Sequence, residues 1–210
     1  VKLRSDKESE INGQGPKITN EDISILNEKL DSLNDGDILV LAGSIPNSLP
    51  SDTYENIMSR LQGKGIKFVV DATKDLLLNV LKYKPFLIKP NHHELAEIFN
   101  TTLSTKEEII AHGKKLQEMG AENVLISMAG DGAILITSTE EIYFSEVPKG
   151  TLKNSVGAGD SMVAGFIAGF ISTNDFKEAF KMGVATGSAS AFSEGLATKD
   201  KVDELLEQLL

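Results

Sequence analysis

The alternation of short apolar runs with amphipathic segments predicts an α/β fold, a sandwich of helices around a mostly parallel sheet. The first observation is that residues 38–42, ILVLA, are apolar throughout, as are strands buried on both faces of a parallel sheet. The second is that segments with apolar residues at helical spacing separate such runs along the chain. The third is size, because 210 residues, 40% of them apolar, are enough to bury one large core.

The elements can be taken in order from the N-terminus. Residues 1–13 predict a short hairpin of two charged, alternating strands, which a Gly/Pro-rich turn at 13–16 separates from the rest. A helix is expected to begin at Thr19, and its apolar face is Ile23, Leu26, Leu30 and Leu33. The elements predicted next are a strand at 38–42, a helix at 51–61, a strand at 66–71, a helix at 76–83 and a strand at 86–88.

The second half of the chain continues this pattern and then changes it. Thr105 and Glu108 have the spacing of a capping box, which opens a helix that is expected to end at Gly120. The remaining predictions are a strand at 124–127, two β runs within 133–148 joined by a polar turn at 138–140, and helices at 159–171, 177–192 and 201–209. No internal repeat interrupts this order, so residues 17–210 are expected to form one domain.

Composition excludes several classes of protein. The chain has 21 basic and 31 acidic residues and a formal net charge of −10, so binding to nucleic acid is not expected. It contains no cysteine, which excludes disulfides and thiolate metal sites and favours a cytoplasmic protein. Its longest apolar run, residues 162–171, is far shorter than the ~20 residues that span a bilayer. Neither a signal peptide nor a membrane partner is expected.

Polar residues follow four consecutive predicted strands at the point where each ends. In open α/β sheets, ligands bind at the carboxyl ends of the strands. Each such residue by itself would be explained by a turn or a helix cap. Because all four groups fall on one edge of one sheet, together they predict a phosphate and metal site. The four segments are Gly43-Ser44-Ile45-Pro46, Asp71-Ala72-Thr73, Lys89-Pro90-Asn91-His92-His93-Glu94 and Met128-Ala129-Gly130-Asp131-Gly132 after Ser127.

The most informative segment is NSVGAGDS, residues 154–161, which runs directly into an apolar helix. Its glycines allow several N–H groups to converge on one point, and a helix N-terminus adds about half a positive charge, so an anion hole is predicted. Asp160 falls in the first turn, where its carboxylate could accept a proton from a hydroxyl that attacks a bound phosphate. A glycine-rich turn with an Asp cap is the structural alternative. The segment is neither a Walker loop nor a GxGxxG fingerprint.

These motifs, taken in order, resemble those of the ribokinase-like (PfkB) sugar kinases. Residues 157–161, GAGDS, resemble the C-terminal signature of the family, and 43–46, 89–94 and 127–132 resemble its GSxP, KPNxxE and ATP-phosphate loops. The resemblance covers the chain from Val1 to the last helix. Within the family, residues 11–16 and 44–46 are most similar to bacterial 1-phosphofructokinases, with tagatose-6-phosphate kinases next.

The resemblance implies a role for each candidate residue. Asp160 would be the catalytic base that deprotonates the acceptor hydroxyl, and the glycine-rich turn formed by Gly157, Ala158 and Gly159 would, with the N–H of Asp160, hold the transferring phosphoryl group. Asn91 and Glu94 would orient Mg²⁺ through water, and Asp71 could join the same metal shell. Ser44 would lie beside the sugar phosphate. The residues that would contact ATP are Lys89, Asn91, Ser127, Ala129, Gly130, Gly132 and Gly159.

The resemblance also implies a fold and a reaction. The fold would be a ribokinase-like three-layer sandwich, with residues 1–16 as a remnant of the β lid and 17–210 as the nucleotide-binding domain. Family chains begin well upstream, so most of the lid and the N-terminal sugar-binding portion would be missing. The reaction would be ATP-dependent phosphorylation of O6 of fructose 1-phosphate, with ATP and Mg²⁺ as cofactors. The alternatives are a tagatose-6-phosphate kinase and a nucleotide-binding module without turnover. In the full-length protein, the lid could pair across a homodimer.

Two further patterns have competing interpretations. HHELAE, residues 92–97, lacks the second histidine of the zinc motif HExxH, so a zinc site is not expected. Small residues at 164, 165, 168 and 169 predict that this helix packs closely on the sheet and keeps the anion hole rigid. The small residues at 187–191 would border adenine by the family resemblance, although close helix packing explains them equally well.

Overall fold

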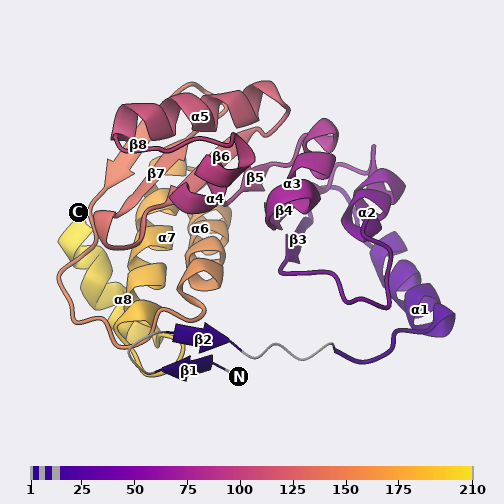
Figure 1. Cartoon of the computed structure of the whole chain (residues 1–210), viewed down its shortest axis with the longest axis horizontal. Helices are drawn as coiled ribbons and strands as arrows, with labels where there is room; N and C mark the ends of the chain where they lie inside the picture. Colours follow the sequence, from indigo (N-terminus) through magenta and orange to yellow (C-terminus); the bar gives the residue numbers. More distant parts are fainter. Residues whose placement is uncertain (1, 5–7, 11–14, 210) are drawn as a thin grey trace.

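A six-stranded sheet forms the centre of the computed structural model, which describes residues 2–4, 8–10 and 15–209 (Figure 1). Its strands lie in chain order, and the first four are parallel while the last two pair antiparallel. The mostly parallel α/β sheet predicted from the sequence is therefore confirmed. The strands are β3 (Ile38–Ala42), β4 (Lys67–Asp71), β5 (Leu87–Ile88), β6 (Asn123–Ser127), β7 (Ala133–Ile136) and β8 (Ile142–Ser145).

Eight α-helices are described in that part of the chain, and they lie on both faces of the sheet (Figure 1). They are α1 (Asn20–Asp31), α2 (Thr53–Leu61), α3 (Lys74–Val80), α4 (His92–Ile98), α5 (Lys106–Glu118), α6 (Ala158–Thr173), α7 (Phe176–Ala191) and α8 (Lys199–Leu206). The capping boxes of Thr19 and Thr105 are both formed, which confirms the predicted starts of α1 and α5. The helix predicted at 76–83 begins two residues earlier and ends in a 3₁₀ turn, Leu81–Tyr83.

Alternate residues of the inner strands face the two helical layers, because side chains of a strand point to opposite faces in turn. Val69, Leu87 and Leu125 pack with α6 and α7 in one buried cluster. Their neighbours Val70, Ile88 and Ile126 pack in the other cluster, to which α1–α5 contribute. All six of these residues have an exposed fraction of 0%. The result is a three-layer sandwich, and α8 packs outside it against α7.

β3 differs from the expectation that its apolar run is buried on both faces. Val40 is 43% exposed, and Ala42 is also exposed. The reason is topological, because β3 lies at the edge of the described sheet and pairs only with β4. An apolar groove runs between Val40 and the outer face of α6, where Ala164, Ile167 and Ile171 line it. The prediction of complete burial is therefore wrong for this strand.

The small residues of α6 pack against α7 and not against the sheet. A β-carbon on Gly165 would lie 2.7 Å from the carbonyl oxygen of Met182, and one on Gly169 would lie 2.8 Å from Cα of Ala179. Ala164 and Ala168 are exposed instead. α7 meets α6 with its own small residues, since a β-carbon on Gly187 would lie 3.0 Å from the carbonyl of Ala158. The sequence indicated close packing correctly but assigned it to the wrong partner.

The predicted N-terminal hairpin is present as a separate two-stranded sheet of β1 (Lys2–Arg4) and β2 (Glu8–Glu10), paired antiparallel with Lys2 opposite Glu10. The turn at Ser5-Asp6-Lys7 lies outside the described residues, as does most of the segment 11–16 that resembles the 1-phosphofructokinases. In the described part of the chain, no helix is both long and apolar enough to cross a membrane.

Candidate functional site

Backbone hydrogen bonds join the carboxyl ends of four neighbouring strands. The N–H of Gly43, after β3, donates to the carbonyl of Asp71 at 3.0 Å, and the N–H of Lys89, after β5, donates to Val70 at 3.1 Å. Asn91 and Ser127 form an isolated parallel bridge, which brings the ends of β5 and β6 together. The segments that sequence analysis placed at one edge of the sheet therefore do lie side by side there.

Asn91 and Glu94 form the N-terminal cap of α4. The side-chain oxygen Oδ1 of Asn91 accepts hydrogen bonds from the N–H groups of His93 and Glu94, both at 2.9 Å. In return, Oε2 of Glu94 accepts a 2.8 Å hydrogen bond from the N–H of Asn91. This capping box orients both side chains at the edge of the sheet. It engages one oxygen of each group and leaves Oε1 of Glu94 and the amide nitrogen of Asn91 without a hydrogen bond among the described residues.

Asp71 and Lys89 form a buried ion pair between the ends of β4 and β5. Nζ of Lys89 lies 3.2 Å from Oδ1 of Asp71, and the two side chains are only 7% and 17% exposed. Burial raises the pKa of the Asp71 carboxyl, Lys89 opposes that rise, and the carboxylates of Asp160 and Glu94 add to it. Three carboxylates thus lie within electrostatic range of one another, and their combined field attracts cations.

The first turn of α6 carries free hydrogen-bond donors. Gly157 is the N-cap and has φ +77°, a conformation that a side chain disfavours. The N–H of Ala158 donates to the carbonyl of Ser155 at 3.3 Å, whereas the N–H groups of Gly159 and Asp160 have no partner within the described ranges. The side chain of Asp160 is exposed and caps nothing. The turn therefore offers two unsatisfied donors beside a free carboxylate.

Residues 127–132 connect β6 to β7 as an antiparallel hairpin around a 3₁₀ turn, η2 (Ala129–Asp131). The N–H of Met128 donates to the carbonyl of Gly132 at 2.8 Å and closes the loop. Gly132 has φ +95°, and a β-carbon there would lie 1.9 Å from the carbonyl of Ser145, so only glycine fits. Gly130 is exposed with no atom within 4 Å of where its β-carbon would be, which leaves its backbone accessible.

Ser44 is exposed in the loop after β3, and a residue that sequence analysis did not single out supports that loop. The hydroxyl of Tyr54, on α2, donates to the carbonyl of Ala42 at 2.6 Å and lies 3.3 Å from that of Gly43. These carbonyls immediately precede Ser44. The sequence signal was present, because Tyr54 is the polar-tipped residue on the apolar face of α2, but its partner could not be known before the loop was placed.

We expect Tyr54→Phe to lower stability by about 1 kcal/mol, because it removes a hydrogen bond to backbone carbonyls without removing the packed ring. A loss of this size in a chain of this length corresponds to roughly 2–4 °C in Tm. Thermal unfolding followed by circular dichroism measures it. Tyr83→Phe on η1 is the control, and equal melting temperatures for parent and Tyr54→Phe would show that the hydroxyl contributes nothing to the loop.

The donor set at the sheet edge fits Mg²⁺ better than a softer metal. The unbonded Oε1 of Glu94 is the kind of oxygen ligand that Mg²⁺ prefers, and the nearby carboxylates of Asp71 and Asp160 provide negative charge. No group of three or more His, Cys, Asp or Glu residues that could enclose a metal is found among the described residues. Because Mg²⁺ keeps several of its water ligands in proteins, the arrangement fits an ion held mainly through water.

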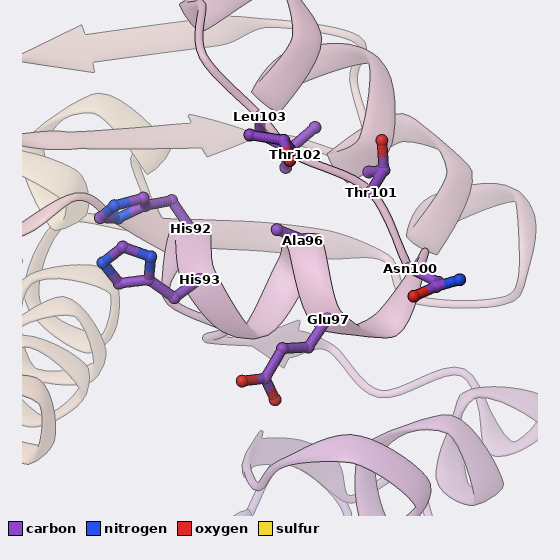
Figure 2. Close-up of a pocket in the computed structure, with 8 residues that line it drawn as sticks. All are labelled: His92, His93, Ala96, Glu97, Asn100, Thr101, Thr102 and Leu103. Carbon is purple, nitrogen blue, oxygen red and sulfur yellow. The ribbon is translucent and has the colours of Figure 1, made fainter.

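The two histidines that follow Asn91 lie beside a different hollow, of about 600 Å³, along α4 (Figure 2). The rings of His92 and His93 lie 3.9 Å apart between centroids at a tilt of 40°, and Nδ1 of His92 lies 3.4 Å from the carbonyl of Ser127. Glu97 leaves a later turn of the helix in Figure 2 and pairs with Lys74 at 3.3 Å. The three side chains do not converge on one point.

The structure thus brings together Asp71, Lys89 and the first turn of α6, and it brings Asn91 beside Ser127. Ser44 makes no hydrogen bond to any of them in the described ranges, although the N–H of the preceding residue, Gly43, donates to the carbonyl of Asp71. The pairing of Asp71 with Lys89 is a feature that sequence analysis missed. Opposite charges at the ends of two consecutive strands were visible, but the pair depends on those strands being neighbours.

Known proteins share this architecture. A family model described as "pfkB family carbohydrate kinase" matches residues 1–202. The chain is 54% identical to the 1-phosphofructokinase of Bacillus subtilis, covering 100% of this chain and 69% of that protein. It is 34% identical to the D-tagatose-1-phosphate kinase of Bacillus licheniformis, covering 99% and 68% respectively. The crystal structure of phosphofructokinase-2 from Escherichia coli in complex with substrates and products superposes with a TM-score of 0.87 at 25% identity, covering 97% of this chain and 67% of that one.

Proposed function

Because this chain belongs to the pfkB family of carbohydrate kinases, we propose that it transfers the γ-phosphoryl group of ATP to O6 of fructose 1-phosphate, giving fructose 1,6-bisphosphate and ADP. The choice of sugar is supported by the 54% identity to the 1-phosphofructokinase of Bacillus subtilis over the whole chain. The 34% identity to a D-tagatose-1-phosphate kinase supports tagatose 1-phosphate as the second candidate. That candidate differs from the tagatose 6-phosphate considered from sequence, which remains in the test below.

One observation carries the mechanistic part of the proposal. The free N–H groups of Gly159 and Asp160, the buried Lys89 ammonium and the exposed Asp160 carboxylate meet at the first turn of α6. A β-carbon on Gly159 would lie 3.1 Å from Nζ of Lys89, so the ammonium reaches this turn. A phosphoryl group bound here would meet two backbone donors, a positive charge and the end of a helix dipole.

Each residue then has a defined task. The Asp160 carboxylate accepts the proton of the 6-hydroxyl as O6 bonds to the γ-phosphorus and the bond from that phosphorus to the β-γ bridging oxygen of ATP breaks. The N–H groups of Gly159 and Asp160 hold the equatorial oxygens of the group in transfer, and Gly157 gives the turn its shape. Lys89 contributes charge, Ser44 contacts the sugar phosphate, and the loop of Ser127, Ala129, Gly130 and Gly132 lines the triphosphate.

The remaining task is to hold the metal. Asn91 and Glu94, fixed by their mutual capping box, would hold Mg²⁺ through its water ligands at the edge of the sheet. An ion held there would supply positive charge that offsets the negative charge of the ATP phosphates. Asp71 lies close enough to add to the negative field at this position.

We expect Glu94→Gln to raise the Mg²⁺ concentration needed for half-maximal ATP binding about tenfold, as is typical when a partner outside the direct ligands is changed. Glutamine keeps an oxygen acceptor for the N–H of Asn91, so the α4 cap should survive. Titration calorimetry with ATP across a Mg²⁺ series measures the shift. Glu97→Gln, on the exposed face of the same helix, is the control, and an equal Mg²⁺ requirement in both variants would contradict the metal assignment.

The function itself is tested by incubating the chain with ATP, Mg²⁺ and each of fructose 1-phosphate, tagatose 1-phosphate, tagatose 6-phosphate and fructose. ADP release and ³¹P NMR of the product identify the acceptor and the position phosphorylated. We expect the highest kcat/KM with fructose 1-phosphate and a bisphosphate product. ATP binding without sugar-dependent ADP release would instead support a nucleotide-binding module, and preference for a tagatose phosphate would change the substrate.

A further inference from the structure

In the ion pair of Asp71 and Lys89, the carboxylate of Asp71 fixes the position of the Lys89 ammonium. Lys89 enters from the end of β5 and is almost completely buried, and its partner in the described part of the chain is Asp71, at the end of β4. Because β4 and β5 are hydrogen-bonded neighbours, both backbones are fixed, and only the side chains can adjust. A buried ammonium that loses its counter-charge is strongly disfavoured and tends to move toward water or lose its proton. Asp71 therefore determines where the ammonium rests.

The Lys89 ammonium lies against the first turn of α6, at Gly159. A β-carbon on Gly159 would approach Nζ of Lys89 to 3.1 Å and Cε to 3.5 Å. The lysine side chain thus passes against the turn at the one position without a side chain. The ammonium then lies next to the two N–H groups that have no partner, those of Gly159 and Asp160.

We propose that Asp71 is a positioning residue that acts through Lys89: it holds the ammonium against the first turn of α6, where the ammonium meets the transferring phosphoryl group. This inference rests on the function proposed above and deepens it. It replaces the sequence-based expectation of Asp71 as part of the metal shell. One carboxylate oxygen of Asp71 already faces the ammonium at 3.2 Å, and the unbonded Oε1 of Glu94 is available for the metal without Asp71.

The two possible roles of Asp71, positioning Lys89 or binding the metal, predict a different dependence of ATP binding on Mg²⁺ in Asp71→Asn. If Asp71 positions Lys89, then Asp71→Asn should weaken ATP binding by the same factor, about tenfold, with Mg²⁺ and with EDTA, since a charge-assisted contact to phosphate is lost in both cases. Turnover should fall about 100-fold, the effect of a misplaced group near the reacting atoms. If Asp71 belonged to the metal shell, the loss would appear only with Mg²⁺, as expected for Glu94→Gln.

A double-mutant cycle provides the second arm of the experiment. We expect Asp71→Asn in combination with Lys89→Met to bind ATP no more weakly than Lys89→Met alone, because Asp71 has nothing left to position. Asp71→Asn combined with Glu94→Gln should instead show additive losses. Additive losses in the Lys89 cycle, together with a raised Mg²⁺ requirement in Asp71→Asn, would overturn the proposal.

The unmodified chain provides a measurement that does not depend on a variant folding. In a ¹⁵N-lysine NMR spectrum, the buried Lys89 ammonium should give a resolved signal, assigned by its absence from Lys89→Met or, if that variant does not fold, by paramagnetic broadening. We expect ATP with EDTA to shift this signal and Mg²⁺ alone to leave it unchanged. A shift with Mg²⁺ alone would overturn the positioning role. A parent chain that binds no ATP in either condition would instead overturn the proposed function, and this inference with it.

Discussion

Asp160→Asn is expected to lower kcat about 100- to 10,000-fold while leaving KM for ATP and sugar phosphate nearly unchanged, because it removes a positioned proton acceptor and little else. Asparagine is nearly isosteric with aspartate, so the turn that carries the free N–H groups of Gly159 and Asp160 should keep its shape. An interaction made only in the transition state lowers kcat and kcat/KM in the same proportion. Steady-state kinetics with each substrate varied in turn gives both parameters.

The structural alternative for Asp160 predicts a different result. As an acidic residue in the first turn of α6, its charge would interact with the helix dipole, a contribution of about 0.3–1 kcal/mol to stability. Its side chain makes no capping hydrogen bond, so that role would be electrostatic alone. A variant that melts slightly earlier and turns over within a few-fold of the parent would show that the base assignment is wrong.

Asp175→Asn is a matched control for this experiment. Asp175 begins α7, which follows α6 antiparallel, so it lies at the end of the helix pair away from the candidate site. Its side chain caps the N–H of Glu178 at 2.9 Å, and asparagine caps a helix about as well as aspartate. We expect this variant to retain the turnover of the parent. A comparable loss in both variants would indicate a general effect of charge at helix starts and not proton transfer at Asp160.

Much of the fold could be predicted because the physical signals are local. Apolar runs, helical spacing and the Thr19 and Thr105 capping boxes are each readable within a dozen residues, and the structure contains the corresponding elements. The polar residues at the strand ends could also be placed on one edge, since all parallel strands present their carboxyl ends to the same side. This is why Asp71, Lys89 and Asn91 could be grouped before any coordinates were known.

What could not be predicted depends on which elements are neighbours. An apolar run looks the same in a central strand and at an edge, so the exposure of Val40 required the strand order. Small residues indicate that another element packs closely against a helix, but they do not indicate which element it is. For α6 that element is α7. The Asp71–Lys89 pair could not be predicted for the same reason, because opposite charges at two strand ends meet only if those strands are adjacent.

Because α6 packs closely on α7, Gly165→Val is expected to destabilise the chain by about 3 kcal/mol, which corresponds to a loss of roughly 6–12 °C in Tm. Gly165 is buried, and a β-carbon there would lie 2.4 Å from Oγ1 of Thr186 and 2.7 Å from the backbone carbonyl of Met182. These two atoms are themselves joined by a 2.7 Å hydrogen bond, so neither can move away freely.

Ala164→Val is the matched control, since it puts the same side chain one residue earlier in the same helix. Ala164 is exposed and lines the groove beside Val40, so a larger side chain there is not placed in the contact with α7. The helix propensity of valine applies at both positions, and glycine itself is a poor helix former, so propensity alone predicts that Gly165→Val is the milder change.

Thermal melts and ATP titrations of both variants distinguish packing from propensity. We expect Gly165→Val to melt earlier and to bind ATP more weakly, because helices forced apart displace the first turn of α6. If Gly165→Val melts at or above Ala164→Val, the close approach to α7 does not hold the two helices in register.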